Sequence, residues 1–165
     1  SYSLINHLHI VTGTISFLIG PLQFLAVIRS RYTKLHRLLG KTFILCVFLS
    51  APTGLFLSFK TTSTPAGVGT ALQSILWFTF TWLAYASIKK QRVSSHQRWM
   101  IRSYALVLCA PFLRLTIMLG DQFFNMHFIE NFSFYYPLMV WLSFIPLIIA
   151  ELYIRFHQFP TDSLY

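Results

Sequence analysis

The sequence predicts an all-α integral membrane protein that crosses the bilayer five times. Of its 165 residues, 55% are hydrophobic and only 10% are charged, whereas an ordinary soluble domain carries about 25% charged residues. The mean hydropathy of +0.60 agrees with this composition. Long uncharged runs recur along the chain, and about 20 such residues cross the hydrocarbon core as a helix. These observations exclude a soluble enzyme, a disordered chain and a nucleic-acid-binding protein as first interpretations.

The expected spans belong to one transmembrane domain, residues 1–165, and lie at about 5–28, 38–59, 70–88, 97–119 and 134–155. The first is an uncharged run, and the second is uncharged from Thr42 to Phe59. The third follows Thr61–Gly69, which is rich in Thr, Gly and Pro and therefore predicts a loop. The fourth carries Arg102 and Arg114, and the fifth is uncharged from Asn131 to Ala150. All are continuously apolar, without the period-two alternation of a barrel strand.

The basic residues predict the orientation of the spans. All Lys and Arg residues except Lys60 and Arg114 lie around the first and third connections or after the fifth span. Because cytoplasmic loops are enriched in Lys and Arg, these connections are expected in the cytoplasm. The N-terminus is then outside, the C-terminus is cytoplasmic, and the location is the inner (cytoplasmic) membrane of the cell.

Two histidines are expected at the cytoplasmic ends of alternate helices. His36 begins the second span and His96 the fourth, and an up-down bundle can bring such helices together across its core. Two imidazoles at one depth suit bis-histidine ligation of haem b. Arg37, Arg98 and Arg102 are candidates to pair with the haem propionates. The alternative interpretation, two loop histidines in a basic headgroup layer, stays open.

Small residues share the helix faces of these histidines. Gly40 follows His36 by four residues and Ser103 follows His96 by seven, so each pair lies on one face. A flat groove for a planar cofactor needs small residues there. Close packing of membrane helices needs them as well, and the spacing does not separate the two interpretations.

Charges within membrane spans are costly and are usually paired or functional. Arg114 near the outer boundary is expected to pair with Asp121. Arg102 and Glu151 lie at similar depth near the inner side, and their pairing would pin the fifth helix to the fourth. The alternative for Glu151 is a proton relay or a contact with quinol.

The outer side carries a further histidine pair and an aromatic segment. His9 begins the first helix and His127 lies in the outer connection, so the two form a possible second ligand site. Residues 121–136 are rich in Phe, Tyr and Asn. They predict either an aromatic belt at the headgroups or an interfacial helix that acts as a lid.

Three segments carry a family resemblance: Gly20–Phe24 (GPLQF), His36–Lys41 (HRLLGK) and His96–Ala105 (HQRWMIRSYA). Together they resemble a bacterial family of predicted multi-pass membrane proteins of unknown function. The resemblance implies that the His and Arg positions belong to the family pattern. A looser resemblance, by helix number and histidine placement, is to cytochrome b561-type haem proteins. The chain departs from that type because it lacks four core histidines, so this likeness implies one haem at most.

The sequence therefore predicts a membrane-bound haem b protein, an electron-transfer module that exchanges electrons with quinol or with a partner protein. It would be a possible component of a membrane oxidoreductase. The alternative is a cofactor-free accessory subunit of a larger membrane complex. The expected partners are the lipid bilayer, anionic lipids at the cytoplasmic face and other membrane subunits. No nucleic acid is expected, and no catalytic residue is assigned because no hydrolase or phosphate-loop motif occurs.

Overall fold

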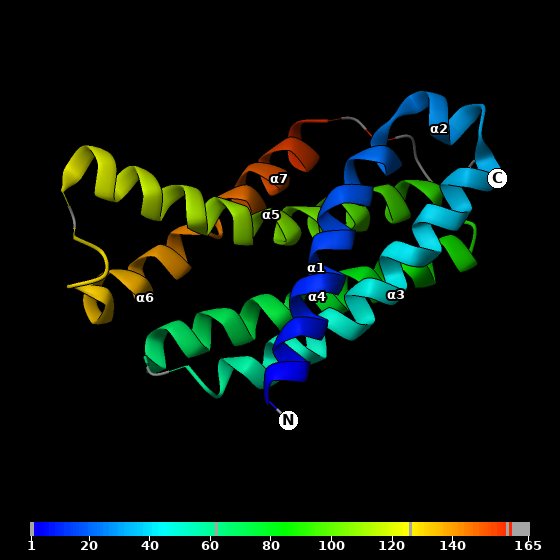
Figure 1. The fold of residues 1–165 in the computed structure, drawn as a ribbon. Helices are drawn as coiled ribbons and strands as arrows, with labels where there is room; N and C mark the ends of the chain where they lie inside the picture. Colours follow the sequence, from blue (N-terminus) through cyan, green and yellow to red (C-terminus); the bar gives the residue numbers. More distant parts are fainter. Residues whose placement is uncertain (1, 62, 126, 158, 160–165) are drawn as a thin grey trace.

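In the computed structural model, residues 2–61, 63–125, 127–157 and 159 are described, and the regular elements among them are all α-helices (Figure 1). Five helical segments of this part of the chain are long and apolar enough to cross a membrane: Ser3–Phe24, Thr33–Ser58, Thr64–Lys89, Val93–Phe124 and Phe132–Phe156. This confirms the all-α, five-span fold class. The assignment of the outer and cytoplasmic sides stays a prediction.

The elements in chain order are α1 (Tyr2–Phe24), α2 (Ala26–Ser30), α3 (Thr33–Ser58), α4 (Thr64–Lys89), α5 (Val93–Phe124), α6 (Phe132–Leu142) and α7 (Ile145–Phe156). α1 packs on α3, α3 on α4, and α4 on α5, which also contacts α1. α7 lies against α5, and α6 lies mainly against α4. Figure 1 shows that α2 and the first turns of α3 and α5 lie at one end of the bundle, while α6 lies at the other end.

The core lies between α3, α4 and α5. Its buried members are Phe43, Val47, Ala51, Trp77, Ala84, Met100, Leu106, Val107 and Cys109. Many large apolar side chains point outward instead, among them Leu18, Leu45 and Ile149. An outward apolar surface is what helices in lipid require. Cohesion therefore depends on close packing and on polar contacts between helices rather than on a hydrophobic force.

Pro21 and Gly20 shape the contact of α1 with α5. Proline cannot bond to the carbonyl four residues before it, which is that of Phe17, and the Tyr104 hydroxyl of α5 donates to this carbonyl at 3.3 Å. The Tyr104 ring occupies the space that a Cβ at Gly20 would fill. α1 then ends at Phe24, and Leu25 has the extended conformation that separates it from α2.

Two boundaries differ from the predicted spans. α4 begins at Thr64 rather than near Thr70, because Pro65 stands at the start of the helix, where its fixed φ is favourable. The glycines that follow did not prevent a helix, since glycine is frequent in membrane helices. The fifth span consists of two helices that are interrupted at Ser143, and Pro146 stands at the start of α7. Gln73 of α4 donates to the Ser143 hydroxyl at 2.6 Å and holds this break against the bundle.

Candidate functional site

His36 and His96 lie at the same end of the bundle, the predicted cytoplasmic end. Each is the fourth residue of its helix, α3 and α5 respectively, so both rings project from a first turn. The backbone N–H groups of both residues bond to the residue four positions earlier, each at 3.0 Å, which fixes the turns that carry the rings. His36 lies within electrostatic interaction range of His96. α3 and α5 therefore carry the two imidazoles at one end of the bundle, and both helices pack on α4.

The hydrogen bond of His96 determines which ring nitrogen is free. Its Nδ1 lies 2.8 Å from the carbonyl oxygen of Ala84 in α4. A carbonyl only accepts, so Nδ1 carries the proton and, in the neutral ring, Nε2 has a free lone pair. A backbone carbonyl on the far nitrogen is the arrangement that orients metal-ligating histidines.

His36 has a different environment. Its Nδ1 is buried and has no hydrogen-bond partner among the described residues. The same holds for Nε2 of Gln23, a residue of α1 that is 6% exposed. Gln23 lies beside His36 on the bundle, because a Cβ at Gly40, one turn after His36, would lie 3.4 Å from the Gln23 side-chain oxygen. Buried polar groups without partners are rare. One lies on a member of the histidine pair and the other beside it, so this end of the bundle is a candidate binding site.

The small residues on these faces are in contact with protein side chains. Gly40 faces Gln23. Ser103 is fully buried, and its hydroxyl lies 2.7 Å from that of Thr81 in α4, which in turn donates to the Trp77 carbonyl at 2.8 Å. At both positions, the geometry is that of close helix packing, one of the two interpretations of the spacing.

Of the three arginines expected to pair with haem propionates, Arg37 and Arg98 make no ion pair with another described residue. Arg37 is exposed and lies within electrostatic range of His36, as does Arg29 of α2, which the sequence did not single out. Arg98 is half-buried and donates to the Ser95 hydroxyl at 3.3 Å. Arg102 is committed elsewhere, so its expected role toward propionates is at odds with its contacts.

Arg102 forms the predicted ion pair with Glu151, which joins α5 to α7. The contact is bidentate: Nε donates to Oε1 at 2.5 Å and Nη2 donates to Oε2 at 3.0 Å. The guanidinium also lies 4.5 Å from the centroid of the Trp99 ring. The Arg102 side chain is 18% exposed and that of Glu151 is 48% exposed, so the ion pair lies at the edge of the bundle.

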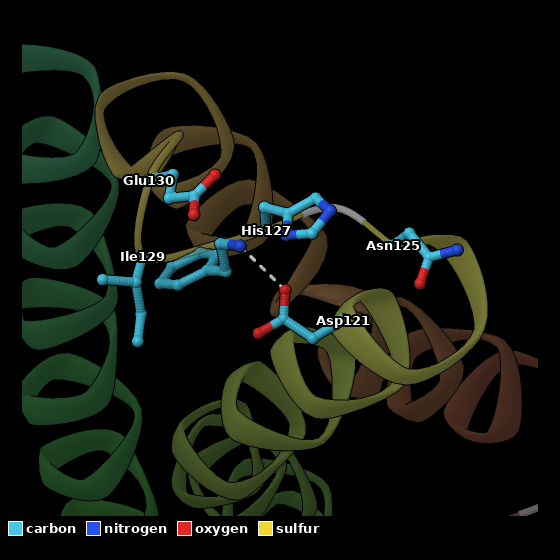
Figure 2. Close-up of a pocket in the computed structure, with 6 residues that line it drawn as sticks. Asp121, Asn125, His127, Ile129 and Glu130 are labelled. Atoms are coloured by element: carbon cyan, nitrogen blue, oxygen red, sulfur yellow. Dashed lines mark hydrogen bonds between the residues drawn. The ribbon is translucent and has the colours of Figure 1, made fainter.

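The expected Arg114–Asp121 pair does not form. Both residues are described, and neither makes an ion pair with the other. They are seven residues apart on α5, which separates them by about 10 Å along the helix axis. Side-chain ion pairs within a helix form between residues three or four apart, so this spacing is too long for a direct pair. Asp121 Oδ1 instead accepts the backbone N–H of Phe128 at 2.8 Å and closes the turn after α5 (Figure 2).

The two outer histidines line different cavities. His127 borders a cavity of about 250 Å³ with Asp121 and Asn125, around the turn shown in Figure 2. His9 borders a larger cavity between the helices, and its Nδ1 bonds to the Ser50 carbonyl at 2.9 Å. Within the described residues, no three His, Cys, Asp or Glu side chains gather as a metal site.

The aromatic segment 121–136 divides into the last turn of α5, a turn, and the start of α6.

Comparison with known proteins identifies the family. Residues 6–154 match the family described as Predicted membrane protein (DUF2306). The chain belongs to this family. Comparison with the curated proteins gives no match, and comparison with the solved structures gives none either. The expected membership of a membrane protein family of unknown function is thereby confirmed, whereas the roles of the His and Arg positions and the likeness to cytochrome b561-type proteins stay predictions.

Sequence reasoning identified the two histidines but not the groups that orient them. The sequence signal for Gln23 was weak, since the residue lies within the GPLQF segment that carries the family resemblance. The Ala84 carbonyl had none, because a backbone acceptor leaves no trace in residue type. Its role follows from the packing of α4 on α5.

Proposed function

We propose that this DUF2306 membrane protein is a haem b electron-transfer module, with His36 and His96 as the axial ligands of the iron. The observation that carries the proposal is the hydrogen bonding and placement of the two imidazole rings. His96 is oriented through its Nδ1–H and leaves Nε2 free, and it lies within electrostatic range of His36 from another helix.

The number of histidines favours haem over a bare metal ion. A structural zinc site takes four protein ligands and a catalytic one takes three, and no group of three is found among the described residues. Haem iron needs only two protein ligands, because the porphyrin supplies the other four. A pair of imidazoles on two helices is therefore sufficient for haem and insufficient for zinc.

The surrounding residues have separate tasks in this proposal. The Ala84 carbonyl holds the His96 tautomer and ring plane. Arg37, Arg29 and Arg98 offer positive charge at the membrane end where propionates would lie. The buried Gln23 amide is a hydrogen-bond donor without a protein partner. Haem bound there would supply one-electron chemistry, and electrons would be exchanged with quinol or with a partner protein.

Visible spectroscopy of the full chain tests the proposal. The protein is purified in detergent from haem-replete cells, and spectra are recorded in the oxidised and dithionite-reduced states. We expect a Soret band that His36→Ala and His96→Ala each abolish. His157→Ala is the matched control, because His157 is exposed at the same end of the molecule and stacks on Tyr153. A colourless, monodisperse preparation, or a Soret band that survives both substitutions, would refute haem ligation by this pair.

A cofactor-free accessory subunit is the second candidate, and one observation favours it. The positions expected to line a flat cofactor groove, Gly40 and Ser103, face Gln23 and Thr81 instead. In this alternative the basic residues around His36, such as Arg37, would contact a partner subunit or lipid headgroups. The same spectra decide between the two functions, since a scaffolding subunit binds no chromophore.

A further inference from the structure

A cavity between the helices lies away from the histidine pair, in the half of the bundle that is predicted to face outward. It has a volume of about 630 Å³ and lies between α1, α3, α4 and α5, with α6 and the turn before it at the border. Figure 1 shows that the outer half of α5 diverges from α4, with α6 between them. Volumes of 300–1,000 Å³ are typical of small-molecule sites.

The cavity carries one permanent positive charge and no negative one. Arg114 lines it, and no Asp or Glu does among the described residues. Arg114 makes no hydrogen bond or ion pair with any described residue. Arg114 is exposed near the predicted outer end of its span. An arginine within a membrane span is costly unless it has a partner, so an anion beside this guanidinium would be stabilised.

A second donor lies in the same wall without a partner. Trp77 is 8% exposed, and its Nε1–H is buried with no acceptor among the described residues. A buried N–H that lacks an acceptor is destabilising. An occupant of the cavity with an acceptor group would relieve this cost as well as that of Arg114.

Several other polar groups of the wall are already engaged. The hydroxyls of Thr70, Ser74 and Ser58 donate to carbonyls of their own helices, at 3.1, 3.0 and 2.6 Å. The Gln73 amide donates to Ser143, and the His9 ring uses Nδ1 for Ser50. Arg114 and Trp77 remain as nitrogen donors for an occupant, together with the hydroxyls of Thr14, Thr61 and Tyr136, which also line the cavity.

We propose that this outer cavity binds a single-chain amphiphile with an anionic headgroup, such as a long-chain carboxylate. Arg114 and the Trp77 N–H hold the headgroup. The alkyl chain lies along the apolar part of the wall, which includes Phe17, Leu57 and Leu113. The site is independent of the proposed haem, because its residues are distinct from those around His36 and His96.

Equilibrium binding of radiolabelled palmitate to the purified full chain in a neutral detergent tests the proposal. We expect saturable binding at one site per chain. Arg114→Gln should weaken it at least tenfold, because a charge-assisted contact is lost, and Arg114→Lys should retain most of it. Arg155→Gln is the matched control, since it removes the same charge from the opposite end of the bundle and should leave affinity unchanged.

Two further experiments test whether binding requires the negative charge of the ligand and whether the ligand lies beside Trp77. Hexadecanol, which has the same chain and no charge, should bind at least tenfold more weakly than palmitate. Dibrominated stearate should quench part of the tryptophan fluorescence, and Trp77→Phe should remove that part while keeping a ring in the wall. Equal affinity for hexadecanol, palmitate binding that is insensitive to Arg114→Gln, or displacement of palmitate by phosphatidylglycerol at equal concentration would overturn the proposal.

Discussion

Replacing Glu151 with glutamine tests the contact between α5 and α7 most sharply. The substitution keeps the shape of the side chain and removes its charge, so it leaves Arg102 without its counter-ion while the Trp99 ring remains in place. The two hydrogen bonds of the pair, at 2.5 and 3.0 Å, are bidentate and charge-assisted, which makes them stronger than neutral bonds.

The expected loss follows from geometry and exposure. A hydrogen bond to a charged group contributes about 1.5–3 kcal/mol, and hydrogen bonds between membrane helices reach at most about 1.7 kcal/mol. Glu151 is 48% exposed, which lowers the value further. We therefore expect Glu151→Gln to cost about 1–1.5 kcal/mol of unfolding free energy, or roughly a 5- to 12-fold change in the unfolding constant.

A double-mutant cycle in mixed micelles measures this energy. Unfolding by increasing mole fraction of sodium dodecyl sulfate is followed by far-ultraviolet circular dichroism for the parent, Glu151→Gln, Arg102→Gln and the double variant. We expect a coupling energy of about 1 kcal/mol or more. Arg155→Gln, four residues later on α7, controls for the loss of a charge at this helix end. Single effects that simply add, within about 0.5 kcal/mol, would show that the pair does not hold α7.

Three further substitutions address contacts between helices: α1 with α5, α4 with α5, and α1 with α3. Gly20→Leu should destabilise the fold by about 1–3 kcal/mol because the Tyr104 ring occupies that space, and Tyr104→Ala should restore part of the loss; equal stability of Gly20→Leu and the parent would contradict the contact. Ser103→Ala should cost about 0.5–1.5 kcal/mol, the value of one buried hydrogen bond, and should cost nothing once Thr81 is valine. Gln23→Leu should leave the haem-free protein as stable or more stable, because the Gln23 amide lacks a partner; a clear loss in the same unfolding assay would show that its amide is satisfied.

Hydropathy predicted the number of spans because the bilayer sets a length that the apolar runs match. The Arg102–Glu151 pair was predictable for a related reason: depth along two helices follows from residue count, and intramembrane charges need partners. The Arg114–Asp121 prediction used depth alone. It failed because residues seven apart on one helix share a face but lie two turns apart.

Features that depend on proline position or on backbone contacts between helices were harder to predict from the sequence. Thr61–Gly69 predicted a loop, yet Pro65 starts a helix there. Pro146 lies within the fifth span, but the interruption at Ser143 involves the tertiary contact with Gln73. The acceptor of His96 is a backbone carbonyl, which no residue pattern reveals. The spacing placed Gly40 on the helix face of His36 and Ser103 on that of His96. The side chains that these two residues contact, Gln23 and Thr81, follow only from the packing of the helices.

Electron paramagnetic resonance of the oxidised, purified protein tests the central proposal, shared ligation by His36 and His96, most directly. Ligation by both rings predicts a low-spin ferric haem signal that becomes high-spin in His96→Gly and returns to low-spin when imidazole is added, because free imidazole replaces the missing ring. His36→Gly should behave in the same way, and His157→Gly should leave the signal unchanged. A folded protein from haem-replete cells with no ferric haem signal, or with a low-spin signal that both glycine substitutions leave intact, would contradict it.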